Sequence, residues 1–198
     1  MMNNKLIIIV LSLLLGSCSI LSPIKNNNLK TYNINTLPDI KHYHKISKTI
    51  SVSKPLASNL YETKEMAYSL RRYSIDYFVK NRWISKPADM LQPLIIQSLI
   101  NTNHFKSVAP SFGIGRFDVT LNTQILQFHQ EFFGSKSVFK LKIHAELIKV
   151  SNGKILASKE FYIIEPSPYC SPYGGVIAAN RATEKMLSQL VGWLAGRA

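Results

Sequence analysis

Hydrophobic and polar positions alternate along several segments of the chain, as they do in half-buried β-strands. The alternation is clearest over residues 138–150, where apolar side chains fall on every second position. Shorter runs of the same kind cover residues 46–52, 119–125 and 154–164, and Pro55 ends the first of them. The strongest inward-facing candidates are Ile50, Val52, Val119, Leu121, Ile125, Phe139, Leu141, Ile143, Ala145 and Leu147.

Two turn signals connect these runs into hairpins. Two alternating runs flank Arg71-Arg72 and predict a hairpin over residues 66–79, although no glycine marks its turn. Asn152-Gly153 separates two further runs, and both residue types tolerate the positive φ of a type I′ turn. We therefore expect a second hairpin at that point.

Two segments carry the helical period instead. In the first, Pro87 suits a first helical turn, where a missing N–H costs nothing. Pro93 would interrupt this helix, so we expect a kink or a start near Met90. The second helix covers residues 174–195, with Gly196 as its C-cap. The two apolar stripes are Leu91, Leu94, Ile95, Ser98 and Leu99, and Val176, Ala179, Thr183, Met186, Leu187, Leu190 and Leu194.

This order of elements predicts an α/β fold. We expect a single domain with a mixed sheet, at least two antiparallel hairpins, and two main helices that cover the sheet.

The N-terminal segment has the layout of a secretory signal peptide. The apolar run over residues 6–15 follows Lys5 and is too short to cross a bilayer, which needs roughly 20 residues. The run ends on Leu15-Gly16-Ser17-Cys18, which resembles the bacterial lipobox. We interpret residues 1–17 as a lipoprotein signal peptide and Cys18 as the lipidated residue; an ordinary signal peptide or an uncleaved anchor are the alternatives.

Acylation of Cys18 would hold the protein at a membrane, since several acyl chains anchor stably where one does not. In such signals the residue after the cysteine directs sorting, and Ser19 favours the outer membrane, with the domain facing the periplasm. The polar residues 18–31 are interpreted as a tether and residues 32–198 as the folded domain. Cys170 then has no intramolecular partner, which leaves a plain loop cysteine, an intermolecular disulfide or a reactive thiol.

The chain is strongly basic, with a formal net charge of +13 and a pI of about 9.8. Such a charge favours anionic surfaces: phospholipid head groups, lipopolysaccharide or an acidic protein. Export would remove nucleic acid from contact. The lysines are dispersed, however, so a solvated basic face explains the charge equally well.

Candidate chemistry is sparse. His42-x-His44 could share a face, but no neighbouring carboxylate or cysteine completes a metal site. The sequence GIGRF at residues 113–117 lacks the third glycine of a dinucleotide fingerprint, and there is no G-x-S-x-G motif. We therefore expect no enzymatic activity, no metal, and no cofactor other than lipid on Cys18.

Residues 61–108 resemble the core of the ABC-type transport auxiliary lipoprotein family, which includes the lipoprotein of the paraquat-inducible operon. The resemblance rests on a tyrosine-rich hairpin, Trp83, Pro87 at a helix start and Phe105-x-x-Val108, and it extends over residues 32–195. Pro93 and the Cys170 loop depart from the pattern. The family implies an anticodon-binding-like α/β fold and a role in lipid traffic beside Mce-domain proteins and an ABC permease and ATPase.

Two functional hypotheses follow. The first is a non-enzymatic adaptor that is anchored in the outer membrane and docks a Mce-domain partner. Phospholipid or another apolar cargo would then pass between the membranes, and another subunit would hydrolyse ATP. Its candidate docking residues are aromatic, with core packing as the alternative for the last: Tyr68, Tyr73, Tyr77 and Trp83. The second is a structural outer-membrane lipoprotein whose basic face binds an anionic envelope polymer or lipopolysaccharide. A homo-oligomer is compatible with either.

Overall fold

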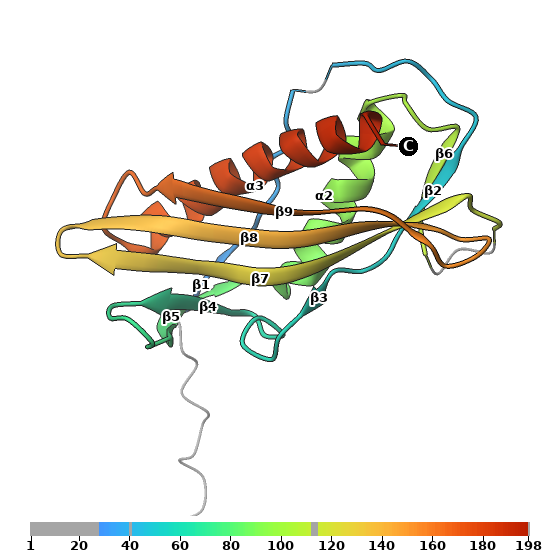
Figure 1. The fold of residues 1–198 in the computed structure, drawn as a ribbon. Helices are drawn as coiled ribbons and strands as arrows, with labels where there is room; N and C mark the ends of the chain where they lie inside the picture. Colours follow the sequence, from blue (N-terminus) through green and yellow to red (C-terminus); the bar gives the residue numbers. More distant parts are fainter. Residues whose placement is uncertain (1–27, 40, 112–114, 198) are drawn as a thin grey trace, which may run out of the picture.

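The computed structural model describes residues 28–39, 41–111 and 115–197. The lipobox residues Leu15, Gly16 and Ser17 and the lipidation residue Cys18 lie outside the described residues. The described part forms a nine-stranded sheet and two helices (Figure 1). The elements are β1 (Lys30–Tyr32), β2 (Thr49–Val52), β3 (Leu56–Ala57), β4 (Glu65–Ser69), β5 (Asp76–Trp83), α2 (Pro87–Asn101), β6 (Ser107–Pro110), β7 (Val119–Phe133), β8 (Lys136–Lys149), β9 (Ile155–Pro166) and α3 (Pro172–Ala195).

Strand β7 organises the sheet. One of its edges pairs antiparallel with β8, which pairs antiparallel with β9. Its other edge receives three short strands in succession, β2, β3 and β4, all parallel to it. β6 extends the sheet beyond β2, and β5 and β1 extend it beyond β4. The sheet is mixed, contains antiparallel hairpins and does not close on itself, which confirms the predicted fold class.

A β-bulge at Leu126 interrupts the regular pairing of β7 with β8. Val119, Leu121 and Ile125 are buried on one face, but the next buried apolar residue is Phe128, three positions later. The pairing with β8 shifts between Ile125 and Gln127, so one extra residue sits in β7. The bulge changes the phase of the alternation and strengthens the local twist.

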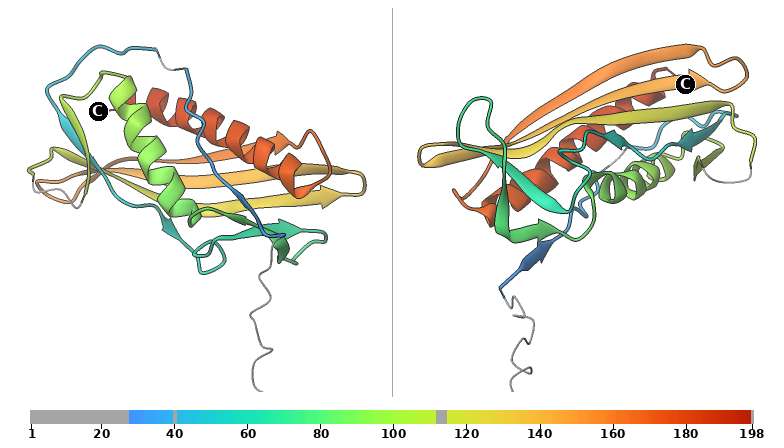
Figure 2. Two further views of the ribbon diagram at one scale, coloured as in Figure 1. Left: turned by 180° about the vertical axis from the view of Figure 1, so that it is seen from behind. Right: turned by 90° about the horizontal axis from the view of Figure 1, so that it is seen from below.

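Both helices cover the same face of the sheet (Figures 1 and 2). α3 packs on β8 and β9, while α2 packs on β2 and β6 and touches α3. The predicted apolar stripes are confirmed: only Leu94 is not fully buried, and Gly196 is the C-cap of α3. α2 begins at Pro87 and includes Pro93, so the expected start near Met90 is wrong. Pro93 and Asp89 are both exposed, and water can therefore solvate the Asp89 carbonyl that Pro93 leaves free.

The hairpin turns differ from their predicted geometry. The hairpin at Asn152-Gly153 is confirmed, but only Gly153 has a positive φ, of 68°, so the turn is not type I′. The loop spans residues 150–154, and the Gly153 N–H donates to the Lys149 carbonyl at 2.9 Å. The hairpin of β4 and β5 is also confirmed, and its positive φ belongs to Tyr73.

Residues 33–39 and 41–48, between β1 and β2, run across the outer side of the helices (Figure 2). Asn180 of α3 holds the start of this connection. Its Oδ1 accepts from the Asn35 N–H at 3.1 Å and the Thr36 hydroxyl at 2.9 Å, and its Nδ2 donates to the Asn33 carbonyl. Lys30 and Thr31, which end the segment interpreted as a tether, already belong to the sheet. One cluster of buried apolar side chains runs from Ile34 to Leu194, so the described residues hold a complete core.

His129 fixes the loop between β3 and β4 to the sheet. Its ring is buried, stacks on Tyr61 and lies with Nδ1 3.0 Å from the Tyr61 hydroxyl. Burial lowers the pKa of His129 below its usual 6.5; Glu131 opposes this shift and Lys140 adds to it.

We expect this lowered pKa to make the protein less stable in mild acid. Below about pH 6.5 the unfolded chain takes up a proton at this histidine while the folded chain does not, so the free energy of unfolding falls as the pH falls toward the folded-state pKa. Urea unfolding at pH 7.5 and 5.5 measures the effect. His129→Gln should remove this part of the pH dependence, and His42→Gln, at an exposed histidine, should retain it. Parallel pH profiles for His129→Gln and the unaltered protein would contradict the assignment.

Candidate functional site: a surface formed by two turns

Two hairpin turns and a loop meet at one end of the sheet (Figure 1). The β4–β5 turn and the end of β7 share a hollow of about 470 Å³, and Cys170 of the β9–α3 loop lies with its Sγ 3.8 Å from the Gly134 carbonyl oxygen. We call this end the turn surface and define it by Leu70, Arg71, Arg72, Tyr73, Phe133 and Lys136.

Large apolar side chains are exposed on the turn surface. Leu70 is 57% and Phe133 55% exposed, and Tyr73 is fully exposed. Arg71, Arg72 and Lys136 are also exposed and place positive charge among these apolar groups. Single exposed apolar residues are ordinary, but a cluster of them with cations between them is typical of an interaction surface.

The backbone holds Tyr73 outward at an energetic cost. Tyr73 has a φ of 65°, in the left-handed region that costs a non-glycine residue about 1–2 kcal/mol. Neighbouring bonds fix the turn: the Ser69 hydroxyl donates to the Arg71 carbonyl at 2.9 Å, and the Ser74 N–H donates to the same carbonyl at 3.2 Å. Strain at a fully exposed aromatic residue favours a function for that side chain over a packing role.

Aromatic packing supports the turn from behind. Tyr68 stacks on Phe78 with 4.4 Å between ring centroids, and Phe132 meets both rings edge-on at 6.0 and 6.2 Å. Tyr77 is partly buried and donates its hydroxyl to the Leu60 carbonyl at 3.0 Å. Its burial raises the pKa of this hydroxyl. Tyr68 and Tyr77 therefore position the turn surface, and Tyr73 is the predicted residue that it presents.

Trp83 corrects the predicted set of docking residues. Its side chain is only 2% exposed and packs edge-on against Phe128 at 5.6 Å. It belongs to the core cluster of buried apolar side chains. Pro87 occupies the first position of α2, as its sequence context predicts, and is buried.

Sequence reasoning missed Phe133 and Lys136. They flank Gly134-Ser135, the turn between β7 and β8, where Gly134 has a φ of 58°. A glycine and a serine between two alternating runs could have signalled this turn.

The described residues offer little for chemistry or for membrane insertion. Within residues 28–39, 41–111 and 115–197, no three His, Cys, Asp or Glu side chains gather closely enough to hold a metal ion. In the same ranges no helix has the length and apolar composition that crossing a bilayer requires.

No family model matches the chain, and no curated protein matches it either. Among solved structures, the fold is similar to that of protein XCC0632 from Xanthomonas campestris, a DUF330 protein, with a TM-score of 0.75 and 20% identity over 85% of this chain and 95% of that one. An uncharacterized protein has a TM-score of 0.65 and 14% identity over 84% of this chain and 99% of that one. The hypothetical protein CT253 from Chlamydia trachomatis has a TM-score of 0.50 and 6% identity over 77% and 98% of the two chains.

These similarities concern the fold. The chain has the α/β fold of the DUF330 protein over nearly the whole length of that protein. At such identities the comparison carries no residue of one site onto the other.

Proposed function

We propose that this protein is a lipid-anchored, non-enzymatic auxiliary component of a Mce-type ABC transport system for lipids or other hydrophobic molecules. In this proposal Cys18 anchors it in the outer membrane, the domain faces the periplasm, and the turn surface docks the Mce-domain partner. The resemblance over residues 61–108 and the lipobox at residues 15–18 support the family and the anchor.

The observation that carries the docking role is the exposure of Tyr73 on a strained turn beside Leu70 and Phe133. Aromatic and arginine side chains supply most of the binding energy of protein interfaces, and Arg71 and Arg72 directly precede Tyr73. The three apolar side chains can form the buried centre of a contact, with the cations at its rim.

The anchor leaves room for such docking. Nine residues lie between Cys18 and Asn28, the first described residue, and the ten steps from one to the other span at most about 35 Å when extended. Asn28 lies near Lys80 of β5 and Tyr173 at the start of α3.

Tyr73→Gly tests the docking role without loss of the fold. Glycine relieves about 1–2 kcal/mol of strain and costs about 0.5–1 kcal/mol of chain entropy, so the free energy of unfolding should stay equal or rise by up to about 1.5 kcal/mol. Co-purification of Mce or ABC components with the full chain should fall tenfold or more. The control is Ile100→Gln, at a residue of α2 that is 47% exposed, and it should leave co-purification unchanged. If Tyr73→Gly retains the partners, or the unaltered chain brings down none, the proposal is wrong.

Cys18→Ser tests the anchor. Serine offers no thiol for acylation, so we expect the protein to leave the membrane fraction for the soluble one, as followed by cell fractionation and blotting. Ser22→Thr, outside the lipobox, keeps the thiol and should stay in the membrane fraction. Retention of Cys18→Ser in membranes would favour an uncleaved anchor.

A further inference from the structure

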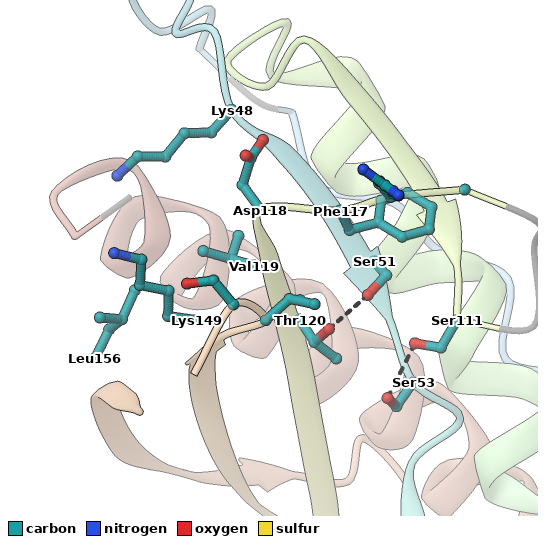
Figure 3. A pocket seen from close by; sticks show the side chains of 14 residues that line it. Lys48, Ser51, Ser53, Ser111, Phe117, Asp118, Val119, Thr120, Lys149 and Leu156 are labelled. Carbon is teal, nitrogen blue, oxygen red and sulfur yellow. Dashed lines mark hydrogen bonds between the residues drawn. The ribbon is translucent and has the colours of Figure 1, made fainter. Parts of the chain in front are cut away.

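A cavity lined by described residues lies at the other end of β7. It has a volume of about 860 Å³, within the usual range of small-molecule sites. The start of β7, strand β2 and the β8–β9 turn form its walls (Figure 3). We call it the basic pocket, and its defining residues are Lys48, Arg116, Phe117, Lys149, Val150 and Leu156.

One part of the basic pocket is apolar and open to solvent. Val150 is 48% and Leu156 39% exposed, and both line the cavity with Phe117. Ile155, next in the hairpin, is 53% exposed. Aliphatic groups at the mouth of a cavity offer a surface on which a hydrocarbon chain would be removed from water.

The other part is cationic. Lys48, Arg116 and Lys149 are exposed and line the same cavity. Among the residues that the structure describes, no carboxylate forms an ion pair with any of the three. Their charge is therefore available to a ligand.

The single acidic side chain of the pocket is already engaged. Asp118 Oδ2 accepts from the Thr49 N–H at 2.7 Å and from the Thr49 hydroxyl at 2.8 Å. These bonds lower the pKa of Asp118, so it stays ionised and bound to β2. The hydroxyls also pair with one another: Ser51 with Thr120 at 2.7 Å, and Ser53 with Ser111 at 3.0 Å (Figure 3). Three cations against one carboxylate leave the pocket electropositive.

We propose that the basic pocket binds an anionic amphiphile, with a phosphate head on Lys48, Arg116 and Lys149 and an acyl chain on Phe117, Val150 and Leu156. A phospholipid has this chemistry. A free phosphate has the same anionic group but no acyl chain, so it would leave Phe117, Val150 and Leu156 exposed to water. The inference does not depend on the docking role, because the 15 residues of β7 place the turn surface roughly 50 Å away.

Binding by the purified full chain tests the inference. Isothermal titration with dodecyl phosphate is compared with glycerol 3-phosphate, which has only the head, and with dodecyl maltoside, which has only the chain; both dodecyl ligands are used below their micelle-forming concentrations. We expect dodecyl phosphate to bind at least tenfold more tightly than either.

Variants at exposed positions locate the site without loss of the fold. The double variant Lys48→Gln/Lys149→Gln should bind dodecyl phosphate at least tenfold more weakly than the unaltered protein. Leu156→Ser should bind it about fivefold more weakly. Lys64→Gln removes an exposed charge outside the pocket and should change nothing. Equal affinity for glycerol 3-phosphate would show a phosphate site instead, and equal affinity for dodecyl maltoside an uncharged groove. Either of these two results overturns the proposal. So does a failure of dodecyl phosphate to bind, and so do pocket variants that bind it as tightly as the unaltered protein.

Discussion

Gly175→Ala is expected to lower the free energy of unfolding by about 3 kcal/mol. A methyl group built on Gly175 would lie 2.2 Å from Gln130 Oε1 and 2.6 Å from its Cδ. Gln130 cannot move aside easily, because it is buried and its Nε2 donates to the Ser137 hydroxyl at 2.8 Å and the Ser171 carbonyl at 3.1 Å. The first turn of α3 would have to separate from β7.

Urea unfolding measures this effect, and Gly192→Ala is the matched control. Gly192 lies in the same helix, is exposed, and its added methyl group would come no closer than 3.6 Å to the Tyr43 hydroxyl. Alanine favours helix there, so stability should rise by up to about 1 kcal/mol. Equal effects of the two substitutions would refute the close approach of α3 and β7.

Trp83→Ala should destabilise the fold by about 4 kcal/mol, since removing a fully buried large aromatic side chain leaves a cavity. The neighbouring Ile84 is 52% exposed, and Ile84→Ala should cost less than about 0.5 kcal/mol. Thermal unfolding, monitored by circular dichroism, measures the stability of both variants. A docking role for Trp83 would give the reverse pattern, with unchanged stability and lost partner binding.

The elements that sequence reasoning predicted well are those whose environment is uniform along their length. β8 has one face under α3 and one toward solvent, so its alternation is unbroken from Phe139 to Leu147. α3 is a long helix against one face of the sheet, and its stripe is regular.

Elements whose surroundings change along the chain were harder to predict. β2 begins at Thr49 instead of residue 46 and buries Ser51 as well as Ile50, because it lies between two strands, β6 and β7. β1 and β3 have too few residues for any period to appear. Their pairing depends on partners about 50 to 70 residues away, which local pattern does not encode.

The same reason limits what could be predicted of the candidate sites. Tyr73 could be proposed as a docking residue from the sequence because its turn is local, while Phe133 comes near that turn only through the pairing of β4 with β7. In the basic pocket, Lys48 and Lys149 meet from opposite halves of the chain. For Trp83 the sequence left docking and core packing as alternatives, because an aromatic residue in a strand suits an interface and a core equally, and its burial favours the core.

The position of β7 also determines the order in which the chain can fold. β2, β3 and β4 precede β7 in the chain, yet all three gain their shared neighbour only when residues 119–133 are present. Such distant pairing slows folding and leaves unpaired strands exposed in the meantime. A chain that emerges from its N-terminus would therefore expose more than a hundred residues before these strands could pair, and a chaperone would have that interval in which to act.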